Sequence, residues 1–205
     1  MKHLAITTLV FFSMLLNASA QTAEDLKQQI DAAAKAAAAK NYKDVNFNLQ
    51  QAMATLATVI GNEVLNVMPK EVNGLKSPSS DDRVNNGGMM FAAGSSIERS
   101  YRSADGAQSI EFKVMANSPM VATLGMMLSN PMYTQSAGNS GEKVISVGGK
   151  RALLKMDKDN KSAEIQIVSG STLYTINANG MINTEADATA MVAKFDLAKI
   201  EALLN

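Results

Sequence analysis

The sequence predicts an α+β protein in which an N-terminal antiparallel helical hairpin precedes a mainly antiparallel sheet of five or six strands covered by helices. Three observations lead to this prediction. Apolar residues recur at three- and four-residue steps between residues 22 and 68, which is the period of an amphipathic helix. After residue 95 the period shortens to two, which is the period of a strand with one buried face. Short turns separate these strands, and short turns join antiparallel neighbours.

Residues 1–20 have the features of a cleavable secretory signal. Lys2 and His3 give a positive start, a mostly apolar stretch covers residues 4–16, and the small residues Ala18-Ser19-Ala20 follow. The apolar stretch is shorter than the roughly 18 residues that a membrane-spanning helix needs. We therefore expect cleavage after Ala20, export to the periplasm and no membrane span in the processed chain. No cysteine follows the cleavage point, so the protein is not expected to be a lipoprotein.

The helical hairpin is expected over residues 21–69. Thr22 and Asp25 form a capping-box pattern at its start, and an alanine-rich helix follows. A break at Asn41-Tyr42 precedes a second helix, for which Asp44 is the expected cap. Pro69 ends that helix. Its expected apolar stripe consists of Leu49, Ala52, Met53, Leu56, Ile60, Val64 and Val67.

Residues 70–94 are rich in glycine, serine, asparagine and proline, so we expect a connector made of turns. The sheet domain then covers residues 95–205. A short helix is expected between Ser118-Pro119 and Asn130-Pro131, because a serine followed by proline is a helix start. Two C-terminal helices are expected after Thr184 and Asp196. The expected strands are residues 97–101, 110–114, 143–147, 151–156, 163–167 and 172–177.

Composition excludes several kinds of chemistry. The chain has 19 basic and 19 acidic residues, so nothing indicates a basic surface for nucleic acid. It has no cysteine, and its one histidine, His3, is lost with the signal. A Ser-His-Asp triad, a thiol nucleophile and the usual zinc sites are therefore absent from the processed chain. We expect a non-enzyme without a cofactor, and a carboxylate- or lysine-based active site is the remaining alternative.

Several sequence pieces resemble a family of proteobacterial periplasmic proteins that has no assigned activity. These proteins have an alanine-rich helical pair, a proline at its end, and arginine and tyrosine in the first strand. The order of elements is also similar to the PsbP and Mog1 class of α+β domains. Both resemblances imply a fold, and the first also implies a compartment, but neither implies a function. The matching pieces are KNYKD, VMPKEVNGLKS, GSSIERSYRS, NSPM, MMLSNPM and VGGKRALLKMD.

Clustered methionines form one candidate site. Thioethers are soft ligands that select Cu(I) or Ag(I), and a chain without cysteine and histidine has no other soft ligands. Core packing is the alternative, because methionine is also a flexible apolar filler. The candidate metal ligands are Met120, Met126, Met127 and Met132.

An apolar patch ringed by basic residues forms a second candidate site. Exposed apolar patches of this kind mark partner or ligand sites. The alternative is a buried connector that covers the sheet. The expected function is therefore a non-catalytic interaction or ligand-binding protein of the envelope, whose partner is an envelope protein or a small ligand. The candidate patch consists of Met89, Met90, Phe91, Arg99, Tyr101 and Arg102, with Arg151 at its rim.

Overall fold

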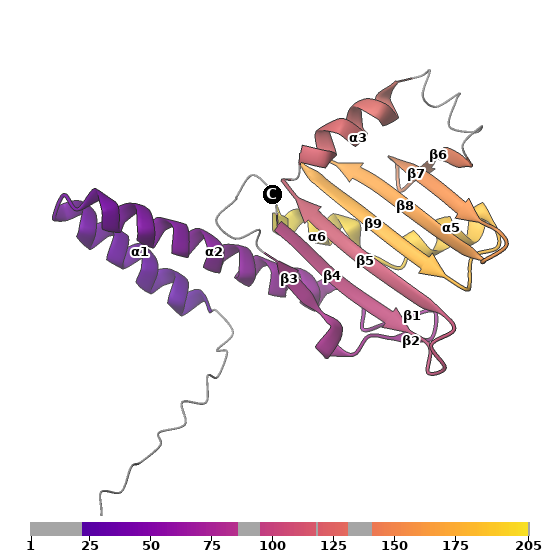
Figure 1. Cartoon of the computed structure of the whole chain (residues 1–205), viewed down its shortest axis with the longest axis horizontal. Coiled ribbons are helices and arrows are strands. Elements are labelled where there is room, and N and C mark those ends of the chain that lie inside the picture. The colour runs from indigo at the N-terminus through magenta and orange to yellow at the C-terminus, as the bar shows by residue number, and fades with distance from the viewer. Residues whose placement is uncertain (1–21, 86–94, 118, 131–140, 205) are drawn as a thin grey trace, which may run out of the picture.

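The fold is α+β, as the sequence predicts: a helical pair is followed by an antiparallel sheet with helices packed on it (Figure 1). The structure, a computed structural model, describes residues 22–85, 95–117, 119–130 and 141–204. Residues 1–20, for which a secretory signal is expected, the candidate-patch residues Met89, Met90 and Phe91, and Met132 lie outside the described residues.

The helical pair consists of α1 (Ala23–Ala38) and α2 (Tyr42–Val67). The capping box of Thr22 and Asp25 is confirmed. The expected cap of α2 is wrong by three residues. Asn41 is the N-cap, and its side-chain oxygen accepts a hydrogen bond from the backbone N–H of Asp44. Asp44 instead accepts a hydrogen bond of 2.6 Å from the amide of Asn41, so both side chains secure the same helix end.

The six expected strands are all present as the long strands of the sheet. They are β4 (Ser95–Arg102), β5 (Ser109–Ala116), β6 (Glu142–Val147), β7 (Lys150–Asp157), β8 (Ser162–Ser169) and β9 (Thr172–Asn179). Their order across the sheet is β4-β5-β9-β8-β7-β6, and every neighbouring pair is antiparallel. The chain therefore crosses from β5 to the far edge and returns through a meander to its centre.

The connector is not made of turns alone. Its described part contains β1 (Glu71–Val72), β2 (Leu75–Lys76), the short 3-10 helix η1 (Ser79–Asp81) and β3 (Arg83–Asn85). Both β2 and β3 pair with β4 and cover its outer edge, which otherwise would present unpaired backbone groups. Strands of two or three residues are too short to show a period of two, so the sequence pattern did not reveal them.

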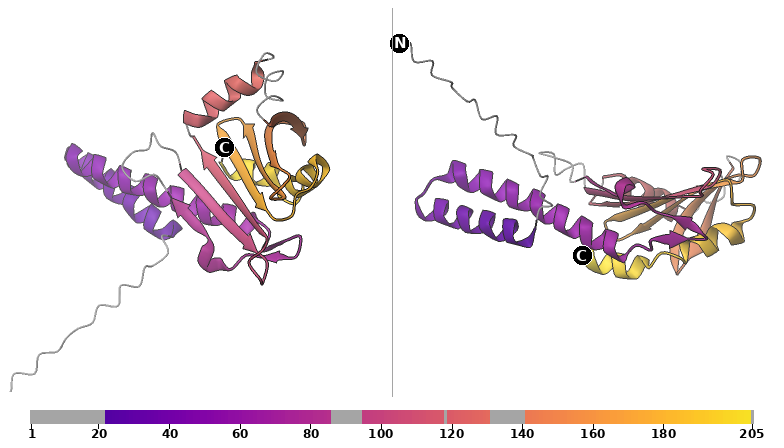
Figure 2. Two further views of the ribbon diagram at one scale, coloured as in Figure 1. Left: turned by 45° about the vertical axis from the view of Figure 1, so that its right-hand side comes forward. Right: turned by 90° about the horizontal axis from the view of Figure 1, so that it is seen from below.

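One face of the sheet holds the main core. It is covered by the C-terminal half of α2, by α5 (Glu185–Val192) and by α6 (Leu197–Leu204), which lie on the same side of the sheet (Figure 2). The expected starts of α5 and α6 are confirmed, because Thr184 and Asp187 form a capping box and Asp196 accepts from the N–H of Lys199. Large fully buried core residues include Ile97, Tyr101, Phe112, Ile165, Tyr174 and Ile176.

The opposite face, which we call the open face, is covered by α3 (Pro119–Ser129) at one end. Val121, Leu124 and Leu128 of α3 pack there against Leu153 and Leu173 of the sheet. The other side chains on this face are mainly polar, as the period of two predicts for strands with one buried face. Among the described residues, no helix combines the length and hydropathy that crossing a membrane requires.

Candidate functional site

A groove lies between α3 and the open face of the sheet. Its volume is about 440 Å³, which falls within the range of about 300–1,000 Å³ that is usual for small-molecule sites. Helix α3 provides one wall and strands β6 to β9 provide the other. The groove is lined by Met120, Thr123, Leu124, Met127, Glu142, Leu153, Gln166 and Leu173.

Helical spacing explains how α3 both packs on the sheet and lines the groove. Met120, Leu124 and Met127 follow each other at steps of four and three residues, so they share one face of the helix. The C-terminal end of α3 is fixed by Arg151 of β7, whose guanidinium donates a hydrogen bond of 2.7 Å to the carbonyl of Leu128. A cation at this helix end is favourable because the last carbonyls lack helical partners.

The groove continues into a polar depression along the open face. A small cavity of about 70 Å³ shares Glu142, Leu153 and Gln166 with the groove. The same small cavity shares Lys155 and Glu164 with a larger one of about 430 Å³. Strand register explains the continuity, because Lys155 lies opposite both Glu142 and Glu164 on neighbouring strands. The larger cavity is lined by Glu111, Lys155, Met156, Asp157, Ser162, Ala163, Glu164, Asn177 and Asn179.

The polar depression is rich in carboxylates. Glu111, Glu142, Asp157 and Glu164 line it, while Lys155 is the basic residue among its lining side chains. The side chain and backbone N–H of Asn160 donate hydrogen bonds to Asp157 and keep the pKa of that carboxyl below its usual value. The depression therefore favours a cation or a hydrogen-bond donor, whereas the groove beside it favours an apolar group.

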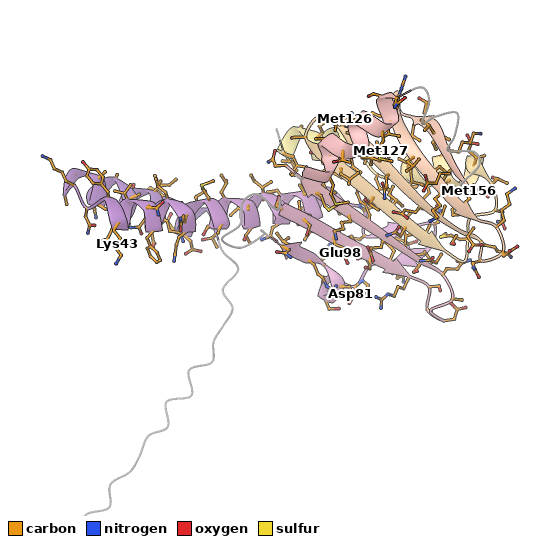
Figure 3. The ribbon with its side chains drawn as sticks, turned by 45° about the horizontal axis from the view of Figure 1, so that its top comes forward. Lys43, Asp81, Glu98, Met126, Met127 and Met156 are labelled. Atoms are coloured by element: carbon orange, nitrogen blue, oxygen red, sulfur yellow. The ribbon has the colours of Figure 1, made fainter. Side chains whose placement is uncertain are left out.

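Two of the four candidate metal ligands share the groove. Met120 and Met127 both line it, whereas Met126 is 69% exposed and is not among its lining residues (Figure 3). Met132 lies outside the described residues. Within the described ranges, no three histidine, cysteine, aspartate or glutamate side chains are grouped so that they could hold a metal ion.

The basic and aromatic residues of the candidate patch are not gathered on a surface. Arg99 is buried, and its guanidinium donates to Asp82 at 2.7 and 2.5 Å. It also donates to the carbonyls of Leu65 and Met68 at 2.9 and 2.8 Å. The hydrogen bond with Asp82 raises the pKa of Arg99. Arg99 therefore joins β4 to the C-terminal end of α2, whose last carbonyls need partners.

Tyr101 has the same structural role as Arg99. Its hydroxyl donates a hydrogen bond of 2.8 Å to the carbonyl of Pro69, and burial raises the pKa of the phenol. Arg102 points to the other face and lies 3.7 Å from Asp81 in an exposed ion pair. Met89, Met90 and Phe91 lie outside the described residues, so the apolar half of the candidate patch is not placed.

A serine beside a lysine provides the arrangement closest to a lysine-based nucleophilic site in the described residues. Ser169 donates a hydrogen bond of 2.6 Å to Glu201, and Lys150 contacts both Ser169 and Glu201. These hydrogen bonds lower the pKa of Glu201. A general base must accept a proton from serine, whereas the Nζ of Lys150 donates hydrogen bonds to both Ser169 and Glu201. The cluster therefore clamps α6 to the sheet, and it lies outside the three cavities described above.

The sequence analysis missed the strand residues that form the groove. Leu153, Leu173, Met115 and Val168 are apolar although alternation places them on the polar face of the sheet. Met115, Val168 and Leu173 lie near the ends of β5, β8 and β9, and Leu153 lies in the middle of β7. Together these exceptions to the alternation indicate a second, smaller core under a covering helix. Leu154, next to Leu153 in the chain, fits the regular alternation and is buried in the main core, so β7 has apolar residues on both faces.

Comparisons with known proteins assign no family to this chain. It matches no protein-family model and no curated protein sequence.

Proposed function

We propose that this chain is an exported, non-catalytic binding protein of the bacterial envelope that holds an amphipathic ligand in the groove beneath α3. The observation that carries the proposal is the continuity of an apolar groove with a carboxylate-lined depression on the same face of the sheet. A ligand with an apolar body and a cationic or hydrogen-bond-donating end is complementary to both parts.

The proposed compartment rests on the sequence. Residues 1–20 have the order of charge, apolar stretch and small residues that is typical of a secretory signal, and cleavage after Ala20 is the expected processing step. The resemblance to periplasmic proteins of proteobacteria supports the same location. A chain without cysteine also folds in an oxidising compartment without the risk of wrong disulfides.

A matched pair of long-chain compounds tests the ligand class. Dodecylammonium and dodecanoate have equal chains and opposite charges, and each can be assayed by displacement of the neutral fluorophore N-phenyl-1-naphthylamine from the processed chain. We expect dodecylammonium to bind about tenfold more tightly, which is a difference of about 1.4 kcal/mol. Equal displacement of the fluorophore by both compounds would contradict the proposal that the carboxylates of the depression select a cationic ligand.

Two neighbouring methionines provide the matched variants. Met127 lines the groove, and Met126 is exposed on another face of α3. Met127→Lys places a charge in the apolar groove, so we expect it to weaken fluorophore binding by about tenfold or more. Met126→Lys adds the same charge to the same helix and should change binding by less than about twofold. Equal effects of the two variants would show that the fluorophore binds elsewhere.

Binding of a soft metal ion is the second candidate function. One observation favours it, namely that Met120 and Met127 line the same groove and could present two thioethers to one ion. Titration of the processed chain with Cu(I) under reducing conditions tests this function. Replacing both residues with leucine keeps the apolar volume and removes the sulfur atoms, so it should abolish Cu(I) binding without closing the groove. An affinity of the unmodified chain weaker than micromolar would exclude this function.

A further inference from the structure

The α1–α2 hairpin projects away from the sheet, and no other element among the described residues packs on the flanks of its outer half (Figures 1 and 2). Helix α1 packs along the N-terminal half of α2. Ala33 of α1 and Ala52 and Thr55 of α2 are buried in the contact between the two helices. The C-terminal half of α2 instead packs on the sheet. Among the described elements, the projecting part of the hairpin therefore packs only through the contact between α1 and α2.

Large apolar side chains follow the inward-facing residues by one position. On α2, Met53 follows Ala52 and Leu56 follows Thr55. On α1, Ala34 follows Ala33 in the same way. One residue is a rotation of about 100° around a helix axis. Because the two helices run antiparallel, this rotation brings the residues of both helices to the same flank of the hairpin.

The flank defined by this rotation forms one exposed apolar surface, which we call the hairpin face. Its large side chains are each between 43% and 72% exposed. Ala34 and Ala37 lie between them on α1, where they allow another helix to approach closely. Lys27 borders the face and is paired with Asp31 at 3.1 Å. The hairpin face consists of Ile30, Tyr42, Leu49, Met53 and Leu56.

We propose that two copies of this chain pair through their hairpin faces and form a four-helix bundle. The five large side chains of the hairpin face carry no formal charge, and an uncharged apolar surface is compatible with its own copy across a two-fold axis. A stable interface buries about 800 Å² per partner, of which a little over half is apolar. The five large side chains, each between 43% and 72% exposed, and the alanines between them supply apolar surface for such an interface, and the polar rim adds to it.

The architecture also favours a second copy. A bundle of four helices encloses one core, whereas a hairpin of two helices leaves one flank of each helix in water. Since the hairpin projects beyond the sheet, the two sheet domains would lie at a distance from the bundle and would not collide (Figure 2). In such a dimer the grooves beneath α3 remain accessible, so the pairing is independent of the proposed ligand site.

Sedimentation velocity of the processed chain across about 1–100 µM tests the pairing. We expect a reversible monomer–dimer equilibrium, and Met53→Asp should raise the dimer dissociation constant by about 100-fold or more because it buries an unpaired charge. Leu49→Asp should have the same effect and provides a second variant on the face. Both residues are exposed in the monomer, so the helical circular dichroism of both variants should be unchanged.

Phe47 provides the control. It is also exposed, but it precedes the half-buried Asn48 by one position and therefore lies on the opposite flank of the hairpin. Phe47→Asp should change the dissociation constant by less than about threefold. A chain that remains monomeric at 100 µM overturns the proposal, and so does a dimer that responds equally to Phe47→Asp and Met53→Asp.

Discussion

Arg99 and Tyr101 show how two distant sequence pieces form one contact. In the structure, side chains of the piece ERSY donate hydrogen bonds to backbone carbonyls of the piece VMPK. Strand alternation places Arg99 on the same face of β4 as Ile97 and Tyr101. It could not reveal that the end of α2 lies over that face, because this depends on contacts more than 30 residues apart.

The geometry at Arg99 predicts that lysine cannot replace it. A lysine has one ammonium group, so it cannot bind both carboxylate oxygens of Asp82 and the two helix carbonyls together. We expect Arg99→Lys to lower the free energy of unfolding by about 3 kcal/mol, measured by urea denaturation. Arg102→Lys is the control, because its ion pair with Asp81 is exposed and should contribute less than about 1 kcal/mol. Equal losses in both variants would contradict the role of the buried contacts.

Glu201 predicts a pH-dependent contribution to stability. Hydrogen bonds from Ser169 and Lys150 lower its pKa in the folded chain below the unfolded value of about 4.3. Its contribution is therefore fully present above that unfolded pKa and is lost as the pH falls through the lower folded pKa.

We accordingly expect Glu201→Gln to destabilise the chain at pH 7 and to differ less and less from the original chain below about pH 4. Urea denaturation at pH 7, 4 and 3 measures this difference. Glu71→Gln changes an exposed carboxylate and should leave stability unchanged at each pH. If Glu201→Gln changes the free energy of unfolding by the same amount from pH 7 to pH 3, the ionised carboxylate of Glu201 does not stabilise the chain as proposed.

At the scale of elements, the features that local sequence determines were predicted well. The capping boxes at Thr22 and Thr184 are present, and the six alternating segments are strands. Both signals arise from residues within a few positions of each other. The short strands β1 to β3 were missed because their pairing with neighbouring strands, β1 with β2 and both β2 and β3 with β4, determines their conformation more than their own sequence does.

Gly61 allows α2 and β3 to lie in direct contact. A Cβ atom at this position would collide with the side chain of Val84. We expect Gly61→Ala to lower the free energy of unfolding by about 1–3 kcal/mol through overpacking, despite the higher helix propensity of alanine.

In α3, a Cβ at Gly125 would meet Val168 at an ordinary 3.8 Å, so Gly125→Ala should stabilise the chain by about 0.5–1 kcal/mol. Urea denaturation compares the two, and a stabilising Gly61→Ala would show that β3 can move away from α2.

At the scale of the whole molecule, the period of two predicts that the sheet has one buried face, but it does not show where the other face is covered by a helix. The alternation of Glu111, Glu164 and their neighbours marks the open face correctly. The position of α3 over one end depends on Leu153 and Leu173, which belong to distant strands. The groove is therefore a product of tertiary packing, and no local motif marks it.

The central position of β5 beside β9 has a consequence for how the chain folds. The hairpin α1–α2, the pair β4–β5 and the meander β6–β9 each consist of neighbours in sequence, and such contacts form rapidly. The β5–β9 pairing joins Ala116 to Thr172 and must close the long intervening chain. We therefore expect the β5–β9 pairing to form last and to limit the folding rate. Until it forms, a folding chain exposes the unpaired edges of β5 and β9.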